Sequence, residues 1–340
     1  MRRRNLEGTM DAAAGERQEI LGEDGHPETD DHERTRIRSA ASVPDTHKLS
    51  SSKVHTTRTV VSCSGIQIGG QDVVLILGPC SIESLSMLQE TAAAARASGA
   101  VMLRGGAFKP RSSPFSFQGL GRRGLDHLAQ VRSETGLPTV TEVTAPEQVE
   151  LVAAHADMLQ IGTRNMQNFA LLREVGRQSK PVLLKRGMMA SVDEWLQAAE
   201  YIMASGNQQV VLCERGMRTF ETRTRFTLDI SAVPVVKKLS HLPVIVDPSH
   251  AAGRRDLVLP MSLAAIAAGA DGVIVEAHPD PQAALCDGAQ SLDLCQLDQL
   301  HSSLSAVAQA VNRRMHEPLP LGSLPSPGGL APGQQLGVVR

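Results

Sequence analysis

Four residues of types that bind metal ions stand at the ends of apolar runs or just after them. Cys80 ends the run "VVLILGPC", His250 ends "PVIVDPSH", Glu276 lies near the end of "GVIVEAH", and Asp287 follows in the next polar stretch. Cys80 alone would be interpreted as a small buried residue. Together, a thiolate, an imidazole and two carboxylates suit a first-row divalent ion that keeps an open position for a substrate. The set predicts a metal centre.

Basic side chains follow the same kind of apolar run. They are Arg104, Lys109, Arg111, Arg164, Lys185, Arg186 and Arg215. Each one by itself could be a solvated loop charge. Like charges gathered in one place repel unless an anion neutralises them, so their recurrence predicts a site for phosphate or carboxylate, and for more than one such group.

A repeating pattern between residues 73 and 311 could position these side chains. Short runs of Val, Ile and Leu alternate with longer segments of helical period, which is typical of parallel strands joined by crossover helices. We predict strands at 73–80, 101–108, 139–143, 158–162, 181–187, 210–216, 243–250 and 272–278. We predict helices at 84–98, 125–135, 146–155, 169–178, 192–204, 257–268 and 297–312.

This strand and helix alternation predicts a TIM (β/α)8 barrel. A doubly wound open sheet is the alternative, but the glycine pattern of a dinucleotide-binding turn is absent after the first strand. In a barrel the functional residues gather at the carboxyl ends of the strands, and the eighth strand pairs with the first. Ahead of the barrel, the sequence predicts a β-hairpin that turns near Gly69 and Gly70 and could plug the bottom.

The two ends of the chain of 340 residues differ in composition from its middle. Residues 1–55 mix acidic, basic, Ser and Thr residues without an apolar period, which predicts a disordered arm. Residues 313–340 are rich in proline and glycine, which predicts a flexible tail. The catalytic barrel with its hairpin is therefore expected at residues 56–312.

Composition argues against several functional classes. A net charge of −2 and 2% aromatic residues offer little for binding nucleic acid. Neither a membrane-spanning apolar run nor a secretory or transit signal is recognisable. Five scattered cysteines without such a signal favour the cytoplasm over a disulfide framework. Apart from Cys80, we interpret the cysteines as structural or incidental: Cys63, Cys213, Cys286 and Cys295.

Seven stretches of the chain, taken in order, carry a resemblance to a known family. They are "GPCSIES", "RGGAFKPRSSPFSFQG", "IGTRNMQN", "LLKRGMMAS", "CERG", "DPSHAAGRRDLV" and "VEAHPDPQAALCDGAQSL". The region from about residue 60 to 305 resembles the short, type I beta form of 3-deoxy-D-arabino-heptulosonate 7-phosphate (DAHP) synthase. The resemblance implies a metal-dependent TIM barrel that condenses phosphoenolpyruvate with erythrose 4-phosphate, releases phosphate and begins the shikimate pathway. It also implies a homo-oligomer, either a dimer or a tetramer.

The resemblance implies roles residue by residue. Metal binding falls to Cys80, His250, Glu276 and Asp287, with Mn²⁺, Fe²⁺, Co²⁺ and Zn²⁺ all suitable. Phosphoenolpyruvate binding falls to Arg104, Lys109, Arg164, Lys185 and Arg215. Arg111 and Ser112 of "KPRSS" would bind erythrose 4-phosphate, and Ser112 keeps the hydroxyl of the KPRTS that is usual in the family. Lys109 and His250 are the expected catalytic residues, with Lys109 either a general acid or only a charge clamp.

Two other functions stay open at this point. The related enzyme that makes 3-deoxy-D-manno-octulosonate 8-phosphate from arabinose 5-phosphate shares the barrel, but its sugar-phosphate loop typically reads like KANRSS rather than "KPRSS". A non-catalytic phosphate-binding barrel is the second alternative, and the complete set of ligands and cations argues against it.

Several further side chains have open roles. The acids Glu142, Glu214 and Asp247 could orient basic neighbours or only balance their charge. His278 could approach the metal. The interpretation that we favour is instead a histidine that lies at the surface or is held by hydrogen bonds.

Overall fold

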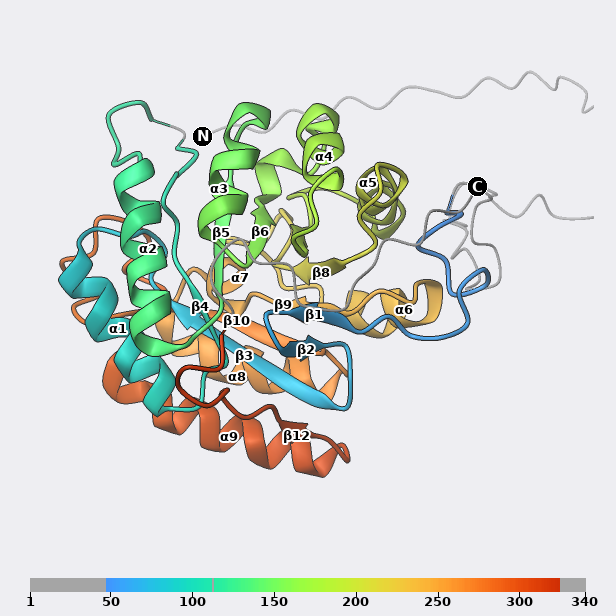
Figure 1. Ribbon diagram of the computed structural model, residues 1–340. Helices are drawn as coiled ribbons and strands as arrows, with labels where there is room; N and C mark the ends of the chain where they lie inside the picture. The colour runs from blue at the N-terminus through green and yellow to red at the C-terminus, as the bar shows by residue number, and fades with distance from the viewer. Residues whose placement is uncertain (1–46, 112, 325–340) are drawn as a thin grey trace, which may run out of the picture. The chain divides into compact units, whose positions relative to one another are not determined.

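The computed structural model describes residues 47–111 and 113–324, which Figure 1 shows as strands surrounded by helices. Within these residues eight parallel strands form a closed ring, because the last strand pairs with the first. In chain order they are β3 (Asp72–Gly78), β4 (Met102–Arg104), β5 (Thr139–Val143), β6 (Met158–Ile161), β7 (Val182–Lys185), β8 (Val210–Glu214), β9 (Val244–Val246) and β10 (Gly272–His278). The TIM (β/α)8 fold and all eight predicted strands are confirmed.

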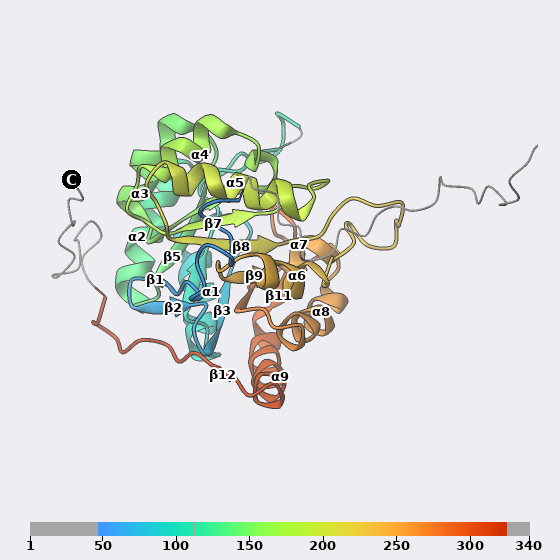
Figure 2. The ribbon, with the colours of Figure 1, turned by 90° about the vertical axis from the view of Figure 1, so that its right-hand side faces the viewer.

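Helices cover the outside of this ring. Those predicted from the sequence are present as α1 (Leu85–Ala97), α2 (Arg122–Thr135), α3 (Val149–His155), α4 (Phe169–Gly176), α5 (Val192–Ala204), α8 (Arg255–Ala267) and α9 (Leu297–Ala310). Figure 2 shows α4 and α5 side by side above β7. The 3₁₀ turns η1 (Pro146–Gln148), η2 (Thr163–Asn165) and η3 (Leu294–Gln296) and the short strand β11 (Leu292–Asp293) complete the connections after the strands.

Two helices were not predicted. Helix α6 (Ala232–Leu239) carries Pro234 in its first turn, where the missing N–H has no intrahelical partner to lose. Helix α7 (Pro248–Ala252) is a single short turn that begins two residues after β9. No element was predicted over the segment of α6, although it is as long as α4, and α7 overlaps the run 243–250 that was predicted as a strand.

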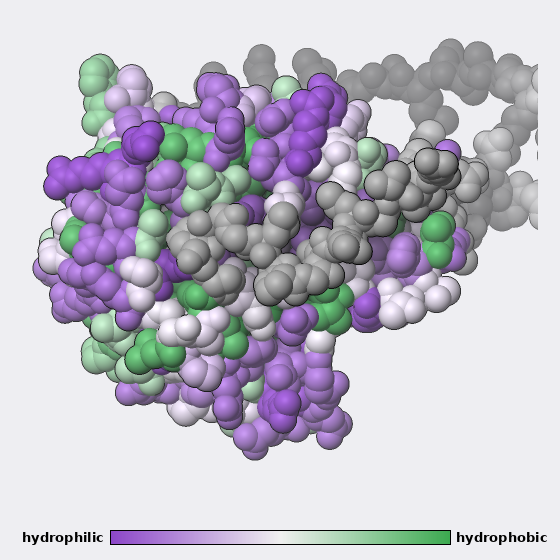
Figure 3. Space-filling model, viewed as in Figure 1, coloured by the Kyte–Doolittle hydropathy of each residue, from purple (hydrophilic) through white to green (hydrophobic). Residues whose placement is uncertain are grey.

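The strands place alternate side chains in two apolar layers. Val74 and Ile76 of β3 lie in the cluster that fills the barrel, whereas Val73, Leu75 and Leu77 pack in the layer shared with the helices. On the face shown in Figure 3 the coloured surface is mostly hydrophilic, with apolar residues in small groups. No helix in the described part of the chain is both long and apolar enough to cross a membrane.

A β-hairpin closes the bottom of the barrel. Its strands are β1 (Val61–Cys63) and β2 (Ile66–Ile68), and their apolar side chains join the cluster inside the barrel. The expected plug is therefore present. The predicted turn near Gly69 and Gly70 is wrong, because the hairpin turns at Ser64 and Gly65, both with positive φ. Gly69 and Gly70 instead lead from β2 into β3.

The folded part extends beyond the boundaries expected from composition. Leu49 and Ser50 donate backbone hydrogen bonds to Glu200 of α5, so residues 47–55 are not part of a disordered arm. At the other end, β12 (Arg314–Met315) pairs with β3, although it falls in the region predicted as a flexible tail. The remaining residues of both predicted segments, 1–46 and 325–340, lie outside the described residues.

A buried ion pair ties the hairpin to the barrel. Asp157 accepts hydrogen bonds from Nε and an Nη atom of Arg132 at 2.7 and 2.9 Å, from the Ser64 hydroxyl at 2.7 Å and from the Thr139 backbone at 2.8 Å. Burial opposes ionisation, but Arg132 and Ser64 outweigh it and lower the pKa of Asp157. With the Thr139 hydroxyl at 3.3 Å, five donor groups face this carboxylate and favour its charged form.

Replacing this carboxylate is expected to destabilise the barrel. Asp157→Asn removes the charge that pairs with the buried Arg132 and should lower the free energy of unfolding by about 3 kcal/mol at neutral pH. Because folding lowers the pKa of Asp157, this contribution is full above about pH 4 and is lost as the pH falls through the folded-state value. Urea unfolding of both proteins at pH 7 and pH 3 checks this, with the exposed Glu150→Gln as control. Equal stabilities at pH 7 would contradict the expectation.

Candidate active site

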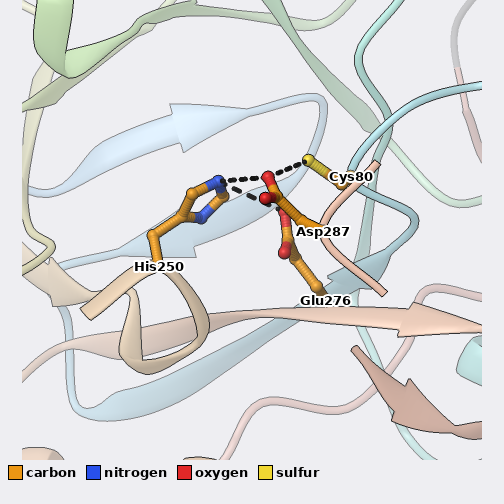
Figure 4. Close-up of side chains that lie close together, drawn as sticks. All are labelled: Cys80, His250, Glu276 and Asp287. Carbon is orange, nitrogen blue, oxygen red and sulfur yellow. Dashed lines mark hydrogen bonds and ion pairs between the residues drawn. The ribbon is translucent and has the colours of Figure 1, made fainter. Parts of the chain in front are cut away.

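The four proposed metal ligands meet at the carboxyl end of the barrel. One ligand atom from each of Cys80, His250, Glu276 and Asp287 lies within 4.8 Å of every other. The Cys80 thiol donates to Asp287 Oδ2 at 3.0 Å, and His250 Nε2 lies 3.3 Å from Glu276 Oε1 and 3.8 Å from Asp287 Oδ2. Figure 4 shows the four side chains pointing toward a common centre.

Strand order explains how these distant residues become neighbours. Glu276 of β10 is in register with Gly78 of β3, two residues before Cys80. Gly78 has φ of 150°, and a Cβ there would lie 2.0 Å from the carbonyl oxygen of Arg104. The glycine in "GPC" therefore allows β3 and β4 to close together just where the thiol leaves the sheet.

Asp247 orients the imidazole of His250. It caps α7 by accepting from the His250 backbone N–H at 2.9 Å, and its Oδ2 lies 2.7 Å from His250 Nδ1. Burial would raise the pKa of Asp247, but His250 and Lys185 hold it well below the usual range. With the Nδ1 proton directed at a carboxylate, Nε2 presents its lone pair to the centre.

Both carboxylate ligands are held by further donors. Glu276 accepts from Arg104 at 2.6 Å and from Gln290 at 2.6 Å. Asp287 accepts from Arg225 at 2.9 Å through Oδ1, which leaves Oδ2 for the centre. Burial opposes ionisation of Asp287, but His250 and Arg225 outweigh it and keep its pKa low. The acids are thus charged at neutral pH.

The donor set fits a divalent transition metal. It offers one sulfur, one imidazole nitrogen and two carboxylate groups, a combination that suits Mn²⁺, Fe²⁺, Co²⁺ or Zn²⁺. A hydrogen bond with Cys286 and burial raise the pKa of the Cys80 thiol. A bound cation would therefore have to displace the thiol proton, because the thiolate is the ligand form.

A cationic pocket of about 260 Å³ adjoins the ligand cluster. Its described lining contains two carboxylates, Glu142 and Asp287, against seven cationic side chains: Arg104, Lys109, Arg111, Arg164, Lys185, Arg215 and Arg225. His250 lines the same pocket. Apart from Ser112, which lies outside the described residues, every residue predicted to bind substrate lines this pocket.

Protein groups hold several of these cations in place. The Lys109 ammonium donates to the Cys80 carbonyl at 3.1 Å and lies 3.2 Å from its sulfur. Lys185 donates to Asp247 at 2.5 Å. The Arg215 guanidinium stacks over the Phe226 ring at 4.1 Å, a contact that fixes its plane.

Arg186 has a different role from its basic neighbours. It is buried, pairs with Glu214 at 3.0 Å and Asp229 at 2.8 Å, and does not belong to the pocket lining. From the sequence, Arg186 was grouped with the basic residues that would bind an anion. In the structure its charge is instead balanced by Glu214, which is one of the two roles left open for that acid. Asp247, in contrast, orients His250.

Two residues of the site escaped the sequence analysis. Arg225 lies on the connection between β8 and α6, away from any strand end, so the pattern of basic residues after apolar runs did not include it. Cys286 was interpreted as structural or incidental, yet its sulfur lies 3.4 Å from that of Cys80 and 2.6 Å from an Arg111 nitrogen. Its position next to Asp287 was the available signal.

Comparison with known proteins gives consistent matches. The family model described as "DAHP synthetase I family" matches residues 49–313. Phospho-2-dehydro-3-deoxyheptonate aldolase of Thermotoga maritima is 48% identical over 298 residues, covering 87% of this chain and 88% of that protein. A 2-dehydro-3-deoxyphosphooctonate aldolase of Nitratidesulfovibrio vulgaris is 34% identical over 251 residues, covering 68% of this chain and 91% of that protein.

Solved structures agree with the sequence matches. The crystal structure of the Thermotoga maritima phospho-2-dehydro-3-deoxyheptonate aldolase (DAHP synthase) has a TM-score of 0.77 and 51% identity, covering 79% of each chain. A truncated form of 3-deoxy-D-arabino-heptulosonate 7-phosphate synthase from the same organism has a TM-score of 0.75 and 47% identity, covering 80% of this chain and 100% of that chain.

Removing the charge of Asp247 is expected to weaken metal binding. Asp247→Asn no longer holds His250 and Lys185 with a carboxylate, so the affinity for Mn²⁺ should fall about 10- to 100-fold. Titration of the metal-free full chain with Mn²⁺ measures this directly. The exposed acid Asp298, changed to Asn, is the control and should bind like the unmodified protein. An unchanged affinity in Asp247→Asn would show that His250 does not depend on this carboxylate.

Proposed function

The chain belongs to the DAHP synthetase I family, and from this premise we propose that its pocket is the active site of a 3-deoxy-7-phosphoheptulonate synthase. The enzyme condenses phosphoenolpyruvate with erythrose 4-phosphate and forms DAHP and inorganic phosphate. This reaction is the first step of the shikimate pathway, which leads to the aromatic amino acids. One observation carries the assignment: a four-residue metal-ligand cluster adjoins a pocket lined by seven described cations.

The pocket's charge matches the two substrates. Phosphoenolpyruvate carries a carboxylate and a phosphate, and erythrose 4-phosphate carries a second phosphate. Bringing these anions together in a partly buried site is unfavourable unless fixed cations offset their charge. Arginine supports this role because its planar fork binds carboxylate and phosphate oxygens in a defined geometry.

We assign the cations by their place in the pocket and by the family resemblance. Phosphoenolpyruvate is bound by Arg104, Lys109, Arg164, Lys185 and Arg215. The phosphate of erythrose 4-phosphate is bound by Arg111 of the "KPRSS" loop, together with Ser112. Arg104 contacts the proposed ligand Glu276, and Lys185 contacts Asp247, which orients the proposed ligand His250. Phosphoenolpyruvate bound to these two cations would therefore lie next to the metal centre.

A bound divalent ion would supply Lewis-acid polarisation of the aldehyde carbonyl. The protein residues do the rest. The cations hold phosphoenolpyruvate so that its C3 faces the aldehyde, and the electrons of its C2–C3 double bond form the new carbon–carbon bond. Lys109 lies beside the cluster, and we assign it the donation of a proton to the aldehyde oxygen. Water then adds at C2, which the new bond leaves electron-poor, and gives up its protons; the bond from C2 to the phosphate oxygen breaks, so that phosphate leaves and C2 becomes a ketone.

The octulosonate reaction is the competing function. The relatives named for it are less similar than the DAHP enzyme, at 34% against 48% identity. The "KPRSS" loop, with Arg111 lining the pocket, also favours the four-carbon aldehyde. The choice among Mn²⁺, Fe²⁺, Co²⁺ and Zn²⁺, the homo-oligomeric state and the cytoplasmic location stay predictions.

The substrate assignment predicts a specific product. The full chain, supplied with phosphoenolpyruvate and Mn²⁺, should form a seven-carbon product with erythrose 4-phosphate and little or no eight-carbon product with arabinose 5-phosphate. Mass spectrometry of the products together with phosphate release measures this, and a chelator should abolish both signals. Turnover of arabinose 5-phosphate alone would identify the octulosonate enzyme, and no turnover of either sugar would favour the phosphate-binding protein.

Loss of a pocket arginine should weaken phosphoenolpyruvate binding. Arg215→Ala removes a cation that the Phe226 ring holds in place, and the loss of a charge-assisted contact is expected to raise the KM for phosphoenolpyruvate roughly 10- to 100-fold. Steady-state kinetics with each substrate varied in turn test this. The exposed Arg254, changed to Ala, is the matched control. An unchanged KM in Arg215→Ala would exclude Arg215 from the binding site.

A further inference from the structure

Glu83 joins the two loops that carry the first and the last of the proposed metal ligands. It follows Cys80 by three residues in the connection between β3 and α1. Its Oε1 accepts a hydrogen bond of 2.8 Å from the backbone N–H of Leu285, two residues before Asp287. The Glu83 side chain is 14% exposed, and the hydrogen bond itself lies at an exposed position of the loop.

His278 faces the other oxygen of Glu83. Its Nδ1 accepts a hydrogen bond of 3.1 Å from the Asp280 backbone N–H, which places the proton of the neutral ring on Nε2. Nε2 lies 3.6 Å from Glu83 Oε2 and has no hydrogen-bond partner among the described residues. His278 is therefore a buried histidine hydrogen-bonded through Nδ1, and it does not belong to the ligand cluster.

Asp287 needs such support because its backbone is in an uncommon conformation. Its φ is 55°, in the left-handed region that few residues other than glycine occupy. Its two oxygens have different partners, Arg225 for Oδ1 and the Cys80 thiol for Oδ2. A small movement of the loop would displace Oδ2 from the other ligands, and metal sites require ligand positions within about 0.5 Å.

From these contacts we propose that Glu83 is a positioning residue for Asp287. By accepting the Leu285 N–H, it sets the separation of the Cys80 and Asp287 loops and so the affinity of the centre for a divalent ion. Glu83 is neither one of the four ligands nor one of the residues that line the pocket, and it acts through the backbone of the loop. The inference rests on the metal centre in the proposed function.

Three substitutions separate the length of the side chain from its charge. Glu83→Asp keeps the charge but is too short to reach the Leu285 N–H, and Glu83→Ala loses both. Each is expected to weaken Mn²⁺ binding to the full chain about 10- to 100-fold, measured by the spin-resonance signal of free Mn²⁺. Glu83→Gln keeps an acceptor at the same reach and should restore affinity to within about threefold of the unmodified protein, a difference worth less than about 0.7 kcal/mol.

Two controls complete the experiment. Glu90→Ala removes an exposed acid from the neighbouring helix α1 and should leave affinity unchanged. In an Asp287→Asn background Glu83→Asp should have little further effect, because Glu83 acts through Asp287. Tight binding by Glu83→Asp, or an equal loss in both backgrounds, would overturn the inference. Failure of the unmodified chain to bind Mn²⁺ would instead overturn the proposed metal centre. If Glu83→Ala does not fold, comparing the Mn²⁺ affinities of Glu83→Asp and Glu83→Gln still tests the inference.

Discussion

Pairing of β10 with β3 is the constraint on which the site depends. It closes the barrel and aligns Glu276 with Gly78, so a carboxylate from the last strand lies near the thiol that follows the first. On its other edge β10 pairs with β9, and His250, which follows β9 in α7, lies on that side of Glu276. An open sheet with the same strands would leave the first and last of them at opposite edges, and no shared centre could form.

Charge compensation determines which basic residues serve the pocket. A buried charge is unfavourable unless it is paired. Some basic residues here are paired away from the pocket, and others are paired while still lining it. Arg186 is neutralised by Glu214 and Asp229, which hold it away from the pocket lining. Lys185 and Arg104 each pair with an acid that itself contacts His250, and both still line the pocket. Cations of the second kind are preorganised for an anionic substrate because their positions are fixed before it binds.

The sequence supported the barrel strongly and its finer features less well. Strands such as β3 are buried on both faces, so they appear as continuous apolar runs that are easy to recognise. The hairpin turn was misplaced because the segment contains glycine at residues 65, 69 and 70, and local composition does not say which one turns the chain. Packing of Ile66 and Ile68 inside the barrel decides it. Helix α7 is about one turn long. Asp247 caps it by accepting the backbone N–H of His250, and this role was not evident from the sequence.

The sequence by itself determined the residue types of the site, the period of the strands and helices, and the family to which both point. These are local properties, because side-chain chemistry and hydrophobic period depend only on neighbours along the chain. Only the tertiary structure decided that Cys286 touches Cys80, that Arg186 is paired away from the pocket, and that Glu83 accepts the Leu285 N–H. Each of these depends on the distance between residues far apart in the chain, which the pairing of strands and the closure of the barrel set and which no local pattern encodes.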